Sequence, residues 1–149
     1  MRTEVVVVEN VHFRALPTDG VVEHLADLWP RRWPKLVLDR PPGVGATGGH
    51  GFVRYTCTAH EPGRRIEFAF DPRVGLHGTH AFEVVPGGLR HVLRGRTTGW
   101  MRLGWPLAVR WLHDALVEDL LDNAATFAGV PPERPARWSW WVRVLRRLR

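Results

Sequence analysis

The feature that most limits the possible folds is a run of four alternating segments between residues 52 and 98. In each segment apolar side chains recur at every second position, as in Ile66, Phe68 and Phe70, with polar or charged side chains between them. The joints are rich in glycine and proline, for example 61–64 and 86–88, as is typical of hairpin turns. This pattern predicts an antiparallel sheet that is covered on one face only.

A long helix, predicted over about residues 107–128, is suited to cover that sheet. Its apolar stripe, at 100° per residue, consists of Val109, Leu112, Leu116, Leu120 and Phe127. Gly129 and the proline pair that follows it predict the end of the helix. The opposite side carries Asp114, Glu118, Asp122 and, unexpectedly, Trp111.

The remaining segments complete an α+β arrangement. We expect a strand over residues 4–14, two short helices between residues 18 and 34, a strand over 35–39 and a glycine-rich loop over 41–51. The predicted fold is a helix-grip: a curved antiparallel sheet of six or seven strands wrapped around the long C-terminal helix. Six strands are clear, and a seventh would have to lie near the glycine-rich loop. Residues 1–130 would form this domain and residues 131–149 a separate tail.

With these elements in this order, residues 4–128 resemble the SRPBCC superfamily, which includes START, pollen-allergen-like and polyketide-cyclase proteins. The most specific stretches are 28–34, 75–82, 89–93 and 111–116. The resemblance implies a deep cavity between sheet and helix that accepts an apolar or amphipathic molecule. It implies no single activity, because the same fold serves many functions, and it transfers no catalytic residue.

Several classes of protein are excluded by what the sequence lacks. A single cysteine, Cys57, forms no internal disulfide, and its apolar surroundings predict an inert thiol. A single serine, Ser139, lies in the basic tail, which argues against a serine hydrolase. We find neither a membrane-spanning stretch nor a signal peptide, and therefore expect a cytoplasmic protein.

We predict no metal and no cofactor. The stretch 43–48 matches the dinucleotide pattern GxGxxG, but two prolines precede it and a strand-like segment follows it, so no helix N-terminus would receive a pyrophosphate. We interpret it instead as a flexible loop at the mouth of the cavity. Eight histidines are present, yet His77 and His80 would point to opposite faces of a strand and could not close a ligand set.

The candidate ligand-binding residues are those that the strands and the helix turn toward the predicted cavity. They are Tyr55, Phe68, Phe70, His80, Phe82, His91, Leu93, Leu112, His113 and Leu116. The four polar members could orient a carbonyl group or move a proton near neutral pH. The alternative is that each polar ring is buried and satisfied by neighbouring groups.

The basic charge is concentrated at the C-terminus. Residues 1–130 carry fifteen basic and fourteen acidic side chains, whereas residues 131–149 carry six arginines and one glutamate. We therefore expect no nucleic-acid partner, because no basic surface would extend over the domain. Residues 138–149 predict a basic amphipathic helix that could fold back on the long helix, contact an anionic membrane surface or bind a protein partner.

The expected partner is a small hydrophobic ligand, either a lipid or a polyketide-like molecule, bound in the internal cavity. Two alternatives remain open at this point: a polyketide cyclase or dehydratase that uses cavity histidines, and a membrane-surface or partner-binding module that acts through the tail. The identity of the ligand and the oligomeric state do not follow from the sequence.

Overall fold

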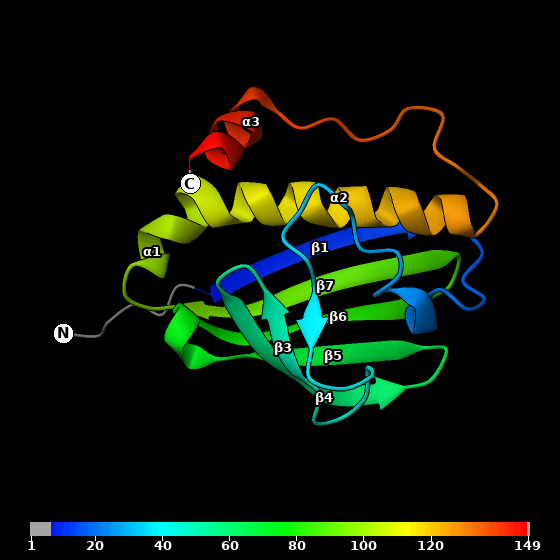
Figure 1. Cartoon of the computed structure of the whole chain (residues 1–149), viewed down its shortest axis with the longest axis horizontal. Helices are drawn as coiled ribbons and strands as arrows, with labels where there is room; N and C mark the ends of the chain where they lie inside the picture. The colour runs from blue at the N-terminus through cyan, green and yellow to red at the C-terminus, as the bar shows by residue number, and fades with distance from the viewer. Residues whose placement is uncertain (1–6, 149) are drawn as a thin grey trace.

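The computed structural model describes residues 7–148, which form a seven-stranded antiparallel sheet packed against one long helix (Figure 1). The strand order is β1-β7-β6-β5-β4-β3-β2. The strands are β1 (Val7–Ala15), β2 (Val37–Leu38), β3 (Thr47–His50), β4 (Val53–Glu61), β5 (Arg65–Phe70), β6 (Leu76–Val85) and β7 (Gly88–Thr97). The predicted helix-grip fold is confirmed.

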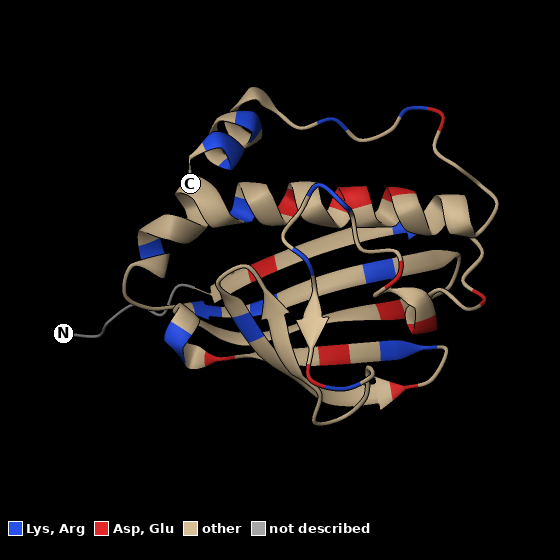
Figure 2. Ribbon diagram, in the orientation of Figure 1, with Lys and Arg blue, Asp and Glu red and all other residues tan. Residues whose placement is uncertain are grey.

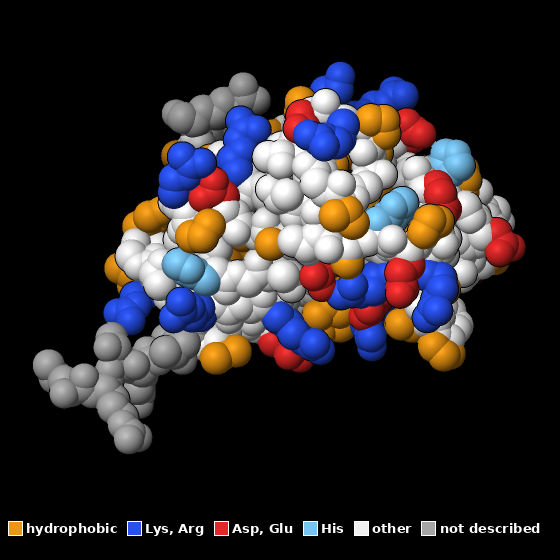
Figure 3. Space-filling view, turned by 90° about the horizontal axis from the view of Figure 1, so that it is seen from below, with side chains coloured by type: hydrophobic (Ala, Val, Ile, Leu, Met, Phe, Trp, Pro, Cys, Tyr) orange, Lys and Arg blue, Asp and Glu red, His pale blue; other side chains and the backbone are white. Residues whose placement is uncertain are grey.

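The hairpin strands form where the alternation predicts them, and their apolar face is buried. In β5 buried residues alternate with half-buried ones along the whole strand, and β5, β6 and β7 pair in continuous register. The face seen from below carries interspersed basic and acidic side chains (Figure 3). Neighbouring strands β6 and β7 are joined by the Arg90–Glu83 ion pair. The sheet is therefore covered on one side only.

The seventh strand lies inside the segment predicted as a glycine-rich loop. Gly48 and Gly49 belong to β3, which pairs with β4 on one side and with the two-residue β2 on the other. A Cβ atom at Gly48 would lie 1.9 Å from the carbonyl oxygen of Val37, so only glycine allows this approach of the two strands. The expectation of a glycine-rich loop over 41–51 is wrong for residues 47–50, because Gly48 and Gly49 take part in strand pairing.

Helical structure begins earlier than predicted. The α-helix α1 (Met101–Gly104) continues through a π-helical turn, η3 (Trp105–Val109), into the 18-residue helix α2 (Arg110–Phe127). Pro106 lies in the π turn, where it has no N–H to continue the α-helical pattern. None of the helices in residues 7–148 is long and apolar enough to span a membrane.

Between β1 and β2 the chain forms less helix than the sequence predicts. The described segment contains the 3₁₀ helix η1 (Val22–His24) followed by turns, in place of two short helices. A second 3₁₀ helix, η2 (Pro72–Val74), connects β5 to β6. Val21, Val22 and Leu25 are nevertheless buried in the main core, so the predicted apolar positions do pack inward.

The tail folds back on the outer side of α2 and ends in helix α3 (Trp140–Arg147) (Figure 1). Ser139 caps α3 by accepting a hydrogen bond from the Val142 amide. Val142 is buried in a small second core with Trp33 and Leu116. Asp119, also buried, accepts hydrogen bonds from the indole nitrogens of Trp33 and Trp138 at 2.8 and 2.9 Å.

Candidate functional site

A small, partly enclosed cavity lies between the inner face of the sheet and α2, and its volume is only about 40 Å³. Its walls come from the segment that covers the sheet, from strands β4 to β6 and from Leu120 of α2. A volume of this size holds a few water molecules, whereas a pocket for a ligand of metabolite size needs roughly 300 Å³ or more. The predicted deep cavity is therefore too small to hold such a ligand in this conformation, because the protein's own aromatic rings fill the interior.

The structure separates the predicted site residues into three groups. Tyr55, Phe68, His80 and Phe82 line the cavity. Phe70, His91 and Leu93 are buried on the sheet without lining it, and His113 continues the same row of rings from the helix side.

Leu112 and Leu116 were predicted to face the cavity, and that prediction is wrong. Both pack in the second core, against Val142 and Trp138 of the tail. The reason is that α2 is apolar on two sides, one for the sheet and one for the tail, so its sequence stripe does not identify the face that meets the sheet. Leu120, Leu121 and Ala124 supply the contact with the main core instead.

The polar candidates form a continuous row of rings through the interior. The ring of Tyr55 lies 4.7 Å from that of His80 between centroids, and His91 follows at 5.6 Å from His80. His91 Nε2 is 3.4 Å from His80 Nδ1, and the ring of His113 is 5.1 Å from that of His91. The row leads from the cavity to the surface of α2 that packs against β1.

Burial keeps these histidines uncharged. It lowers the pKa of His80 and of His91 well below the ordinary value, and the charge of His113 lowers both further. At neutral pH both rings are therefore neutral, and each has one N–H donor and one acceptor nitrogen. His80 Nε2 and His91 Nδ1 are buried and have no hydrogen-bond partner among residues 7–148.

His50 is a site residue that the sequence analysis missed. Its Nδ1 lies 2.9 Å from the Tyr55 hydroxyl, and burial lowers its pKa to about 4. His50 was overlooked because it lies in the segment predicted as a loop. The polar end of Tyr55 is thus satisfied, whereas the ring nitrogen of His80 is not.

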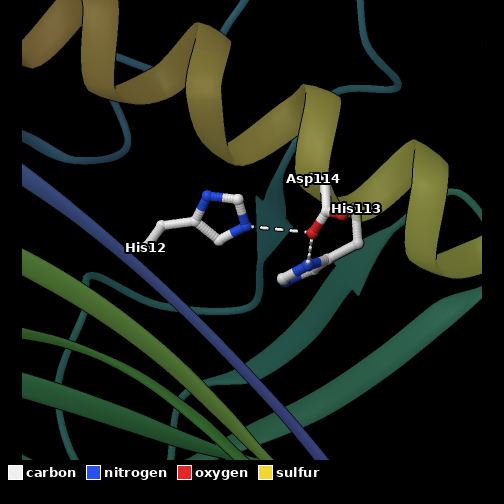
Figure 4. A group of neighbouring side chains, drawn as sticks. All are labelled: His12, His113 and Asp114. Carbon is white, nitrogen blue, oxygen red and sulfur yellow. Dashed lines mark hydrogen bonds and ion pairs between the residues drawn. The ribbon is translucent and has the colours of Figure 1, made fainter.

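A second cluster joins β1 to α2 and was also missed (Figure 4). His12 Nε2 lies 2.9 Å from Asp114 Oδ1, and His12 Nδ1 lies 2.8 Å from Glu118 Oε1. Arg14 extends the cluster by pairing with Glu118 and Asp122. The apolar residues Val11 and Phe13, which alternate with His12 and Arg14 in β1, are about half exposed. Instead, His12 and Arg14 point toward α2. There they pair with the carboxylates of α2 that were expected on its outer side.

The charges in this cluster shift its pKa values. Burial alone would lower the pKa of His12, but hydrogen bonds to Asp114 and Glu118 raise it to about 9. Burial alone would raise the pKa of Asp114, but the nearby His113 ring, together with hydrogen bonds from His12 and Asn10, holds it far below its usual value. His12 is therefore an imidazolium that bridges two carboxylates at neutral pH.

The same atoms are the one geometric candidate for a metal site within residues 7–148. His12, His113 and Asp114 each offer one donor atom, and these atoms lie within 4.8 Å of one another (Figure 4). Two imidazoles and a carboxylate are ligands that zinc accepts. A metal ion would, however, have to displace the proton that His12 shares with the carboxylates, so the arrangement fits an ion-pair network better.

A larger hollow lies outside the space between the sheet and α2. It is an open groove of about 800 Å³ between residues 27–32, the second half of α2 and the strap 131–136. Asp119 and Asp122 lie in its floor, and the Ala136 amide donates a hydrogen bond to Asp122. The groove is formed by the folding back of the tail.

Comparison with known proteins finds similarity in the fold and not in the sequence. No family model matches the sequence, and no curated protein matches it. Among solved structures, major latex-like protein 151 from Panax ginseng superposes with a TM-score of 0.59 at 7% identity, covering 82% of this chain and 97% of that one. Truncated norcoclaurine synthase from Thalictrum flavum has a TM-score of 0.56 at 13% identity, covering 85% and 97%. The di-domain ARO/CYC StfQ from the steffimycin biosynthetic pathway has a TM-score of 0.52 at 22% identity, covering 84% of this chain and 51% of that one.

Proposed function

Because the chain has the helix-grip fold of the SRPBCC superfamily, we propose that it binds a small, largely apolar molecule between the sheet and α2. The observation that carries this proposal is the ring of His80. It lines an apolar cavity, and its buried Nε2 has no partner in the described part of the chain. An unsatisfied buried polar atom costs about 1–3 kcal/mol. A ligand hydroxyl, which can donate to or accept from this ring nitrogen, would remove the cost.

Entry of such a ligand requires the cover of the cavity to move. Trp29, Leu36 and Leu38 line the cavity from a segment whose regular structure is limited to the two-residue β2. These three side chains are only partly buried. Displacing them would enlarge the cavity without breaking the pairing of the five central strands.

The proposal can be tested with 2-naphthol, an apolar double ring with one hydroxyl, added to the full chain and followed by NMR. We expect saturable shifts of the Trp29 indole signal and contacts from the naphthol ring to Phe68 and Phe82. Leu36→Ala enlarges the space under the cover and should tighten binding by about threefold to tenfold. Leu112→Ala, a change of the same size in the second core, should leave the affinity unchanged.

Two outcomes would refute this function. One is the absence of saturable binding by both the unchanged protein and Leu36→Ala up to millimolar 2-naphthol. The other is binding with contacts only to the outer groove beneath residues 131–136, because the ligand would then occupy a different site.

An enzyme of the polyketide-cyclase type is the second candidate. The observation that favours it is the neutral pair of His80 and His91, whose facing nitrogens are 3.4 Å apart. A neutral imidazole beside a bound polyketone could remove a proton next to a carbonyl group. His80→Ala and His91→Ala should then each abolish turnover of a polyketone, while His91→Ala, which changes no residue of the cavity wall, should leave 2-naphthol binding unchanged. Turnover that survives both changes would exclude this candidate.

A further inference from the structure

α1 and α3 lie at the same end of the molecule (Figure 1), and both helical regions carry large exposed apolar side chains. Trp100, Leu103, Leu107 and Trp111 are spaced by three, four and four residues along the continuous helix from α1 to α2, so they lie on one face of it. Leu103 is exposed to 69% and Leu107 to 60%. We refer to these four residues together with Trp140 as the apolar platform.

The fold-back of α3 adds to the platform. The Trp141 indole donates a hydrogen bond to the carbonyl oxygen of Leu107 at 2.8 Å, which fixes the first turn of α3 beside the π turn. Val142 points inward and is buried, whereas Trp140 remains exposed to 68%. The fold-back therefore buries one side of α3 against the domain and leaves another side exposed to water.

The helical stretches 100–111 and 140–147, which carry the platform, contain basic residues and no acidic ones. The chain has no acidic residue between Glu83 and Asp114, and none after Glu133. Arg102, Arg110, Arg143 and Arg147 are all exposed in these stretches, and basic residues cluster at this end in Figure 2. Acidic residues occur instead along the middle of α2 and on the strands.

We propose that the apolar platform is a docking surface for an anionic lipid bilayer. Tryptophan and leucine side chains that project from a basic helical surface enter the headgroup region, and the surrounding arginines are attracted to anionic lipids. A protein partner or a second copy would have to bring acidic groups to complement the four arginines. A second copy offers the same basic surface, so symmetric pairing through the platform would bring like charges together.

This surface differs from the one that the sequence alone suggests. The sequence assigns membrane contact to residues 138–149, but Trp138 and Trp141 use their indole nitrogens to hold the tail on the domain. Residues 100–111 add four exposed large apolar side chains to the three that the tail keeps exposed, which are Trp140, Val144 and Leu148. The proposal does not depend on the internal cavity, because none of the platform residues lines it.

The test is cosedimentation of the full chain with vesicles of phosphatidylcholine containing 30% phosphatidylglycerol. We expect binding that weakens at high salt and is much weaker on pure phosphatidylcholine. The double variant Leu103→Asp/Leu107→Asp should lower the partition coefficient by about tenfold or more, because two exposed leucines are replaced by anions. Both positions are on the surface, so circular dichroism and thermal melting should show a folded protein.

A matched control makes the result specific. Val7→Asp/Val11→Asp places the same two charges at exposed apolar positions of β1, and it should change the partition coefficient by less than about twofold. Equal losses in both double variants would overturn the proposal, as would the absence of binding by the unchanged protein. A dimer that light scattering detects in the unchanged protein, and that Leu103→Asp/Leu107→Asp dissociates, would also overturn it in favour of self-association.

Discussion

At the scale of single residues, His12 shows how a strand residue takes its orientation from a helix. The side chain bridges Asp114 and Glu118 of α2, and Arg14 repeats the pattern one strand period later. These contacts link two elements that are about a hundred residues apart in sequence. Each partner would be a buried or half-buried charge without the others, so the group acts as a unit.

The contribution of the His12 ion pairs to the free energy of unfolding should depend on pH. The folded pKa of His12 is about 9, above its ordinary value of 6.5, so its contribution is fully present below pH 6.5 and is lost as pH rises through 9. His12→Gln should therefore lower the free energy of unfolding at pH 6 by up to about 3 kcal/mol. Near pH 10 the difference from the unchanged protein should be much smaller. Urea denaturation at the two pH values measures this, and a difference that does not vary with pH would contradict it.

At the scale of elements, β3 depends on glycine for its place in the sheet. Gly48 lies opposite Leu38 in β2 and opposite Tyr55 in β4. Its missing side chain is what lets the backbone of β2 approach. Because β2 continues into the cover of the cavity, the geometry of β3 also determines how tightly that cover is held.

Gly48→Ala should therefore destabilise the protein by about 1–3 kcal/mol. The added methyl group would overlap the carbonyl oxygen of Val37, and the pair of strands would have to separate. Gly43→Ala is the control, since a Cβ there would lie 3.9 Å from its nearest neighbour and should change stability by less than about 0.5 kcal/mol. Thermal melting compares the two, and equal effects would show that the close approach does not matter.

At the scale of the whole molecule, the tail closes the second core and is held by a buried carboxylate. Asp119 receives two indole N–H groups and a guanidinium group of Arg32, while Val142 covers Trp33 and Leu116. The C-terminal segment is therefore part of the packing of the domain as well as a source of exposed apolar surface.

Removal of residues 131–149 should lower the melting temperature. The loss of Val142 burial and of the Trp138 hydrogen bond removes about 2–4 kcal/mol, which corresponds to about 5–15 °C for a chain of this size. Scanning calorimetry of the truncated and full chains measures the effect. An unchanged melting temperature would mean that the tail contributes nothing to folding.

The sequence predicted most of the central sheet and the inward face of its strands. The alternation that places Tyr55, Phe68, His80 and His91 inward is a local property, because successive strand residues point to opposite faces whatever the neighbouring elements are. The turn residues between β4, β5, β6 and β7 are equally local. For these reasons the order of the hairpins and the identity of the buried rings follow from the sequence alone.

Three features were decided only by the tertiary structure. Which side of α2 meets the sheet depends on the competing tail, and which side of β1 faces inward depends on carboxylates contributed by α2. Whether the interior is hollow depends on how the rings of β4 to β7 and the leucines of α2 share a fixed volume. In each case, alternative packings are compatible with the same pattern of apolar residues along the chain. They differ in free energy only through contacts between residues that are distant in sequence.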